Sequence, residues 1–108
     1  MNCKPKVLVE GDHFYISQCK NCKRIGLYFN NLMAGFSKDE FIQFSSAILQ
    51  LEFNDGQIIF PDRQERIVIQ TCHLNIHFTF AEEEFETLKE NIAQAKLLIE
   101  VGDVISIK

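Results

Sequence analysis

The sequence contains no tryptophan and has only five glycines and two prolines among its 108 residues. So few glycines and prolines exclude a collagen-like or low-complexity chain, and a 46% hydrophobic content argues against a disordered one. No stretch approaches the roughly 18 uncharged apolar residues of a transmembrane helix, and the N-terminal segment lacks the apolar run of a signal peptide. We therefore expect residues 1–108 to form a single cytoplasmic domain around one core.

The net charge of −4 is distributed unevenly along the chain. Residues 1–24 hold five basic and two acidic side chains, a net of +3, whereas residues 25–108 hold six basic and thirteen acidic ones, a net of −7. An acidic chain repels polyphosphate backbones at long range. Nucleic-acid binding is therefore disfavoured unless one face gathers the basic side chains, and only the N-terminal segment offers such a face.

The first amphipathic helix is predicted to begin at a capping box, in which Ser37 and Glu40 satisfy each other's backbone amides. Apolar residues then recur at spacings of three and four, which places them on one face of a helix. These residues are Phe41, Phe44, Ile48 and Leu51. We expect the helix to end at the turn 54–56.

The second amphipathic helix follows an acidic first turn, residues 82–84, which suits the positive end of a helix. Its apolar stripe consists of Phe85, Leu88, Ile92, Ala95 and Ile99. Gly102 is expected to end it, and the apolar tail 103–108 is then expected to pair as a strand, within the subunit or with a neighbour. A homodimer joined through sheet edges or these tails is the favoured assembly.

The remaining segments alternate apolar and polar residues as strands do. We expect strands at residues 7–10, 14–17, 25–29, 32–36, 57–60, 66–71 and 74–80. The fold class is therefore α+β, with antiparallel strands and two amphipathic helices. Similar sequences before both helices favour an internal repeat, 1–53 and 54–101, of strand-strand-helix units around one sheet, although any strand before a capped helix has a similar pattern.

Cys19 and Cys22 form a CxxC motif in a polar turn before a strand, which is the spacing of a zinc knuckle. Such a site needs further ligands, and Cys3 and His13 are the candidates if the first hairpin folds back, with residues 72–73 as another contributor. The alternative is a pair of reduced cysteines without a metal. Thiol redox catalysis is disfavoured, because a thioredoxin-like site precedes a helix, whereas this motif precedes a strand.

The order of Cys3, the CxxC motif, the segment 25–30 and the helix start 36–41 resembles a family of small Bacteroidetes proteins of unknown function over nearly the whole chain. The resemblance implies no activity. It does imply an N-terminal Cys-x-His pair that would complete a four-ligand site with the CxxC motif, but Pro5 stands here in place of the histidine.

At the level of the fold, the pattern of strands that lead into a capped helix, given twice, is similar to Pur-type and Whirly-type folds, which bind single-stranded nucleic acid. Such binding needs exposed aromatic side chains among cations. The sequence places these together only in its N-terminal segment, at Phe14, Tyr15, Lys20, Lys23, Arg24 and Tyr28.

The sequence therefore predicts a non-catalytic binding or regulatory module that binds no membrane, whose CxxC motif is either a pair of reduced cysteines without a metal or a structural zinc knuckle. Its ligand or partner protein is not specified by any motif. The alternative function is single-stranded nucleic-acid binding by the basic N-terminal sheet face, and a thiol redox protein is the least favoured hypothesis.

Overall fold

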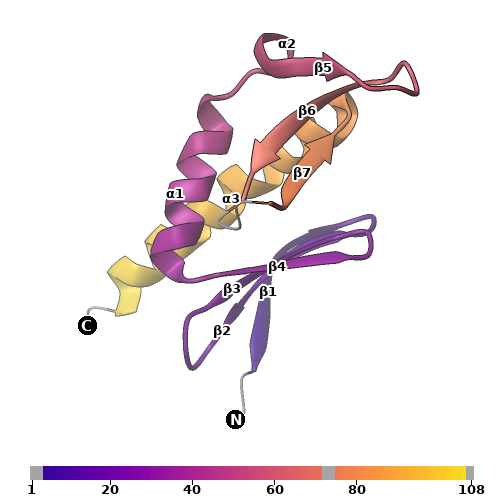
Figure 1. The fold of residues 1–108 in the computed structure, drawn as a ribbon. Coiled ribbons are helices and arrows are strands. Elements are labelled where there is room, and N and C mark those ends of the chain that lie inside the picture. The colour runs from indigo at the N-terminus through magenta and orange to yellow at the C-terminus, as the bar shows by residue number, and fades with distance from the viewer. Residues whose placement is uncertain (1–3, 72–74, 107–108) are drawn as a thin grey trace.

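The computed structural model describes residues 4–71 and 75–106, the side chains of 103–106 excepted. Two antiparallel sheets and three helices make up the fold (Figure 1). Sheet A has the strand order β1-β2-β3-β4, and its strands are β1 (Pro5–Gly11), β2 (Phe14–Cys19), β3 (Ile25–Phe29) and β4 (Leu32–Phe36). Sheet B has the order β5-β6-β7, and its strands are β5 (Gln57–Ile59), β6 (Glu65–Gln70) and β7 (His77–Phe80). The helices are α1 (Lys38–Gln50), α2 (Phe53–Gly56) and α3 (Glu82–Ser106).

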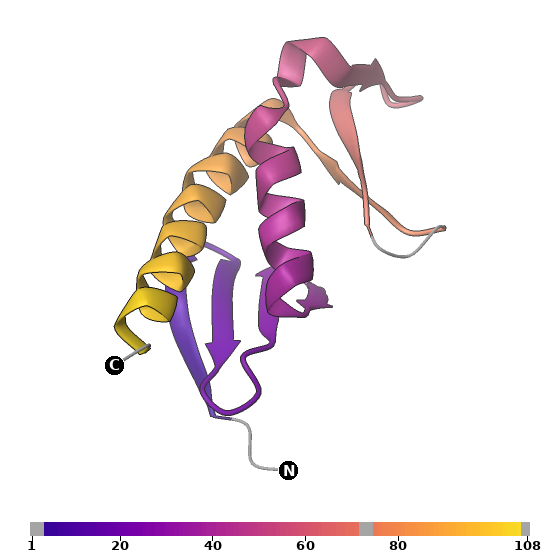
Figure 2. The ribbon, with the colours of Figure 1, turned by 90° about the vertical axis from the view of Figure 1, so that its left-hand side faces the viewer.

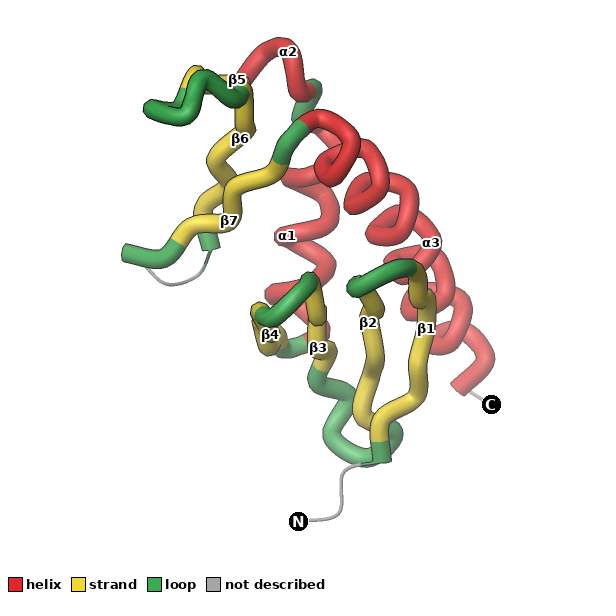
Figure 3. The backbone as a smooth tube through the Cα atoms, turned by 90° about the vertical axis from the view of Figure 1, so that its right-hand side faces the viewer, coloured by secondary structure: helices red, strands yellow, loops and turns green. Residues whose placement is uncertain are grey.

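The long helix α3 connects the two sheets. It contacts β1 of sheet A, β6 and β7 of sheet B, and the neighbouring helix α1, which lies beside it in Figure 2. Figure 3 shows α3 beginning beside β7 of sheet B and running on along β1 of sheet A. One cluster of buried apolar side chains includes residues from both sheets and all three helices. The inner face of each sheet is therefore covered, and the opposite face of sheet A points away from the helices (Figure 1).

The predicted α+β class is confirmed, with two differences in arrangement. The strands form two separate sheets among the described residues, not one sheet. The segment 25–29, which resembles the segment before α3, is separated from α1 by β4, whereas β7 leads directly into α3. The two similar segments thus do not occupy equivalent strands, and the internal repeat stays a prediction.

The start of α1 is as predicted. The Glu40 amide donates to Ser37 Oγ at 3.1 Å, and the Ser37 amide donates to Glu40 Oε1 at 2.8 Å. The helix ends earlier than expected, at Gln50, because the chain turns extended at Leu51 before the short helix α2 begins. Leu51 therefore leaves the helical face and is exposed, while Phe41 and Ile48 are buried.

The apolar stripe of α3 is confirmed, because all five of its residues are buried. The expected end at Gly102 is wrong, since the helix continues to Ser106. A glycine inside a helix costs only about 1 kcal/mol relative to alanine, and none of the described glycines has the positive φ of a helix terminator. The predicted tail strand is thus wrong for residues 103–106, and 107–108 lie outside the described residues. The homodimer stays a prediction.

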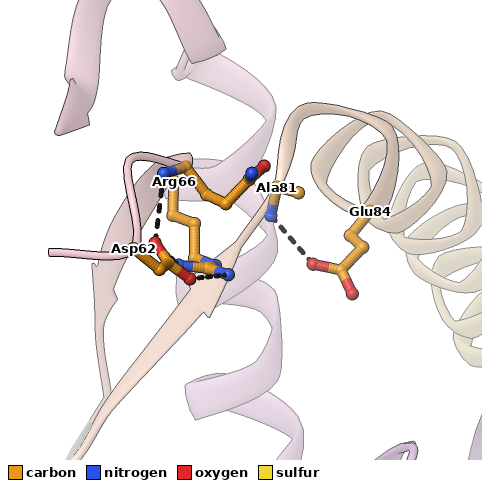
Figure 4. A network of polar contacts seen from close by, with 5 residues as sticks. Asp62, Arg66, Ala81 and Glu84 are labelled. Atoms are coloured by element: carbon orange, nitrogen blue, oxygen red, sulfur yellow. Dashed lines mark hydrogen bonds and ion pairs between the residues drawn. The ribbon is translucent and has the colours of Figure 1, made fainter. Parts of the chain in front are cut away.

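A hydrogen-bonded turn joins β5 to β6 next to the start of α3 (Figure 4). Arg66 donates to both carboxylate oxygens of Asp62, at 3.1 and 2.9 Å, and the Gln64 amide donates to Asp62 Oδ1 at 3.0 Å. The hydrogen bonds from Arg66 hold the pKa of Asp62 below its usual value. Nearby, the Ala81 amide donates to Glu84 Oε1 at 2.8 Å, which fixes the first turn of α3.

Ser45, in the middle of α1, is fully buried, and its hydroxyl has no hydrogen-bond partner within the described part of the chain. A buried hydroxyl without a partner is destabilising by about 1 to 3 kcal/mol. We expect Ser45→Ala to leave the free energy of unfolding unchanged or to raise it by up to about 1 kcal/mol in urea denaturation. A loss of more than about 1 kcal/mol would show that the hydroxyl contributes a bond.

Candidate binding site on sheet A

The two faces of sheet A differ in chemistry. Side chains alternate between the faces, and the register of the strands assigns each residue to one of them. The inner face is built from Val9, Phe14, Ile16, Ile25, Leu27 and Phe36, all of which belong to the buried core. The outer face, on the opposite side, carries Tyr15, Ser17, Gly26, Tyr28, Met33 and Gly35.

Tyr15 and Tyr28 form an aromatic pair on the outer face. They are direct partners across β2 and β3, and their rings stack with centroids 4.1 Å apart and planes 13° apart. Gly26 makes room for this arrangement, because a Cβ atom there would lie 3.0 Å from Tyr28 Cε1. The ring of Tyr28 thus lies flat against the backbone of its own strand, and the pair forms a rigid aromatic surface.

Arg24 and Met33 extend the aromatic pair. Gly35 lies opposite Gly26 in the register, and a Cβ atom at Gly35 would lie 3.8 Å from Arg24 Nη2. The guanidinium group therefore reaches over the outer face beside the strand that carries Tyr28. Met33 is the direct partner of Tyr28 and is 60% exposed. We call Tyr15, Tyr28, Arg24 and Met33 the outer patch.

The basic residues of the N-terminal segment gather at one end of sheet A. Pro5 pairs with Cys19, and the Lys20 amide donates to the Lys4 carbonyl at 3.0 Å, so the start of β1 lies beside the turn after β2. This basic end holds Lys4, Lys6, Lys20, Lys23 and Arg24. The two acidic residues of the segment, Glu10 and Asp12, lie toward the opposite end of the hairpin, where Tyr15, the partner of Glu10, is about 13 Å along β2 from Cys19.

The position of Tyr15 in the outer patch changes the pKa of its phenol. Desolvation, together with the neighbouring Tyr28 hydroxyl, raises the pKa of Tyr15 above its ordinary value. The folded state thus favours the protonated phenol over the phenolate. The stability that the protonated phenol contributes is present below the ordinary pKa of about 10 and is lost as the pH rises through the raised pKa. We expect an alkaline absorbance titration to show a late-ionising tyrosine that is missing in Tyr15→Phe, and its persistence in that variant would contradict the assignment.

The structure places the two predicted metal-binding cysteines on one turn. Cys19 is buried at the end of β2, Cys22 is exposed, and the Cys22 amide donates to Cys19 Sγ at 3.4 Å. Lys23 has a φ of 66°, and its amide donates to the Cys19 carbonyl at 3.1 Å, which closes the turn. The CxxC motif therefore forms a tight, hydrogen-bonded turn in which the Cys22 amide faces the sulfur of Cys19.

The other predicted metal ligands are not brought to this turn within the described residues. His13 lies in the turn between β1 and β2, at the opposite end of the hairpin, too far from Cys19 to share an ion with it. Cys3 and residues 72–73 lie outside the described residues. Within the ranges 4–71 and 75–102, no group of three or more His, Cys, Asp or Glu side chains could hold a metal ion. The zinc knuckle stays a prediction.

Comparison with known proteins gives one result. A family model, described as a family of unknown function (DUF6686), matches residues 1–106. The chain belongs to this family. The predicted resemblance to a family of unknown function is thereby confirmed. No curated protein and no solved structure matches the chain, so the predicted likeness to Pur-type and Whirly-type folds is not confirmed.

In this DUF6686 member, the predicted nucleic-acid-binding residues separate into three locations. Tyr15, Tyr28 and Arg24 come together in the outer patch, whereas Lys20 and Lys23 lie in the cysteine turn at the basic end. Phe14, which the sequence placed with them, is 3% exposed on the inner face, where its ring contacts that of Phe29 edge-on. It therefore belongs to the core.

Sequence reasoning missed Met33 and the two glycines of the outer face of this DUF6686 chain. Along β4, Met33 and Gly35 point to one face of the sheet and the core residue Phe36 points to the other, so the alternation of the strand could have identified Met33 as an outer-face residue.

In the described part of the chain, no helix is long and apolar enough to cross a membrane.

Proposed function

We propose that this protein is a non-catalytic binding module that binds single-stranded nucleic acid on the outer face of sheet A. The observation that carries the proposal is the outer patch, in which two stacked tyrosine rings lie beside a guanidinium group on a sheet face that the helices leave uncovered. Proteins that bind single strands combine aromatic side chains, on which bases stack, with cations that follow the backbone.

The geometry of the tyrosine pair fits base stacking. The rings are already parallel, so an unstacked base can continue the stack without a rearrangement of either side chain. Met33 is a flexible apolar neighbour of Tyr28 that can contact the rim of a base. A double helix keeps its bases inside, so this surface favours single strands over duplexes.

The arrangement of charge explains how a chain with a net charge of −4 could bind a polyanion. The acidic first turns of α1 and α3 belong to the helix layer, which covers the inner face of sheet A. The five cations of the basic end adjoin the outer patch through Arg24. Glu10, the direct partner of Tyr15, lies at the end of the patch away from the cysteine turn, where its negative charge repels phosphate groups. We therefore expect the phosphate backbone to run from the tyrosine pair toward the cysteine turn.

The direct test is fluorescence anisotropy with a labelled oligothymidylate of about 12 nucleotides, within the site sizes of single-strand binders. If Lys20, Lys23 and Arg24 each neutralise one phosphate, the affinity falls roughly 10- to 20-fold between about 50 and about 200 mM salt. The matched duplex should bind more weakly. The proposal fails if the single strand does not bind, or if inorganic polyphosphate of equal charge binds as tightly, because stacking would then contribute nothing.

The two glycines of the outer face provide a matched pair of variants. Gly26→Ala places a methyl group against the Tyr28 ring and should displace it, which we expect to weaken oligothymidylate binding about 3- to 10-fold. Gly35→Ala adds the same methyl group at the paired position, with no atom closer than 3.8 Å, and should leave the affinity unchanged. Equal effects of the two substitutions would contradict the role given to the Tyr28 ring.

A further inference from the structure

The inner face of sheet A departs from its apolar pattern at one place. Inner positions of β1 and β2 are occupied by apolar core residues such as Val9 and Ile16, which are direct partners. Lys6 and Gln18, also direct partners, occupy the next inner positions toward the cysteine turn. Lys6 is exposed and Gln18 is half-buried, so the apolar inner face gives way to polar side chains at this end of the sheet, and such departures from the local pattern are expected at functional sites.

At this place the sheet and α3 enclose a groove of about 390 Å³. Lys6, Lys20 and Lys23 line it from the side of the sheet, and Leu98 and Ile99 line it from α3. Its volume lies in the range of small-molecule sites, roughly 300 to 1,000 Å³. We call it the lysine groove. It lies between sheet A and α3 and contains none of the four outer-patch residues, although Lys20 and Lys23 also belong to the basic end.

The charges of the lysine groove are unbalanced. None of its described lining residues is acidic, and within the described chain none of its three lysines forms an ion pair. The groove's shape is fixed on one side, because Gln18 Nε2 donates to the Lys23 carbonyl at 3.2 Å and holds the turn against β2. Three lysines and no described acidic residue line the groove, so its lining is electrostatically complementary to an anion.

The opposite wall of the lysine groove is apolar. Leu98 is 41% exposed there, while Ile99 is buried beneath it. A bare inorganic anion would leave this apolar surface in contact with water, whereas an anion with a hydrocarbon tail would cover it. We propose that the lysine groove binds a small organic anion with an apolar tail, of the class of medium-chain carboxylates, with its carboxylate among the lysines and its tail against Leu98.

The test is isothermal titration calorimetry of the full chain with butanoate, hexanoate and octanoate. Each added methylene that is buried raises the affinity by up to about fourfold. We expect the affinity to rise from butanoate to octanoate, Lys6→Gln to weaken octanoate binding about 3- to 10-fold, and Leu98→Asn to flatten the dependence on chain length. Arg63→Gln, which removes one positive charge in the turn of sheet B, should leave the affinity for octanoate unchanged.

The proposal is overturned if octanoate does not bind, if acetate or sulfate binds as tightly, or if Arg63→Gln weakens octanoate binding as much as Lys6→Gln. The same substitution at Lys20 gives a second variant, should Lys6→Gln not fold. In a ¹H–¹⁵N correlation spectrum, the amide resonances of Leu98 and Ile99 should shift on addition of octanoate. Lys20 and Lys23 also belong to the proposed nucleic-acid site, so the variants that separate the two proposals are at residues they do not share: Tyr15→Ala should weaken oligothymidylate binding and leave octanoate binding unchanged, and Leu98→Asn should do the reverse.

Discussion

Phe85→Ala is expected to lower the free energy of unfolding by about 3 to 5 kcal/mol, because it removes a fully buried ring from the apolar face of α3. The ring lies 6.3 Å, centroid to centroid, from that of Phe53 in α2, and Lys89 Nζ lies 5.6 Å above it. Its loss would therefore leave a cavity next to the Phe53 ring of α2. Urea denaturation followed by circular dichroism measures the change.

The matched control for this substitution lies on the same helix. Leu97 is 60% exposed, so Leu97→Ala should change the free energy of unfolding by less than about 0.5 kcal/mol. A loss below about 1 kcal/mol in Phe85→Ala, or a loss of similar size in both variants, would mean that the burial assigned to the two faces of α3 is wrong.

Replacing both Tyr15 and Tyr28 with alanine is expected to weaken oligothymidylate binding by about 10- to 100-fold, since base–aromatic stacking contributes about 1 to 3 kcal/mol for each base. The doubly substituted Tyr15→Phe, Tyr28→Phe protein keeps both rings and should bind within about threefold of the original. Anisotropy titrations at one salt concentration compare the three proteins, and denaturation curves confirm that each is folded. If the alanine protein binds normally, the outer patch does not contact the nucleic acid.

The strands and helices of this chain were predictable because their signals are local. The capping box of Ser37 and Glu40 and the stripe that begins at Phe85 each fall within one element, and the structure confirms both. The end of α3 was not predictable from Gly102 alone. A single glycine ends a helix only when its backbone turns left-handed, and that depends on what the following residues can pack against.

The separation into two sheets and the composition of the site depend on contacts between distant residues. His13 was predicted near the cysteines, but the register of β1 with β2 places it at the far end of the hairpin. The pairing of Tyr15 with Tyr28 also follows from register, which a sequence pattern does not specify. Arg24 reaches the patch beside Gly35, and only the pairing of β3 with β4 brings these two residues together.

Binding of single-stranded nucleic acid on the outer face of sheet A can be located residue by residue in a ¹H–¹⁵N titration of the whole chain with unlabelled oligothymidylate. We expect shifts in β2 and β3 around Tyr15 and Tyr28 and in the turn around Arg24, with α1 and sheet B unchanged. Shifts confined to the helices or to sheet B, or no shifts at protein concentrations of hundreds of micromolar, would contradict binding on this face.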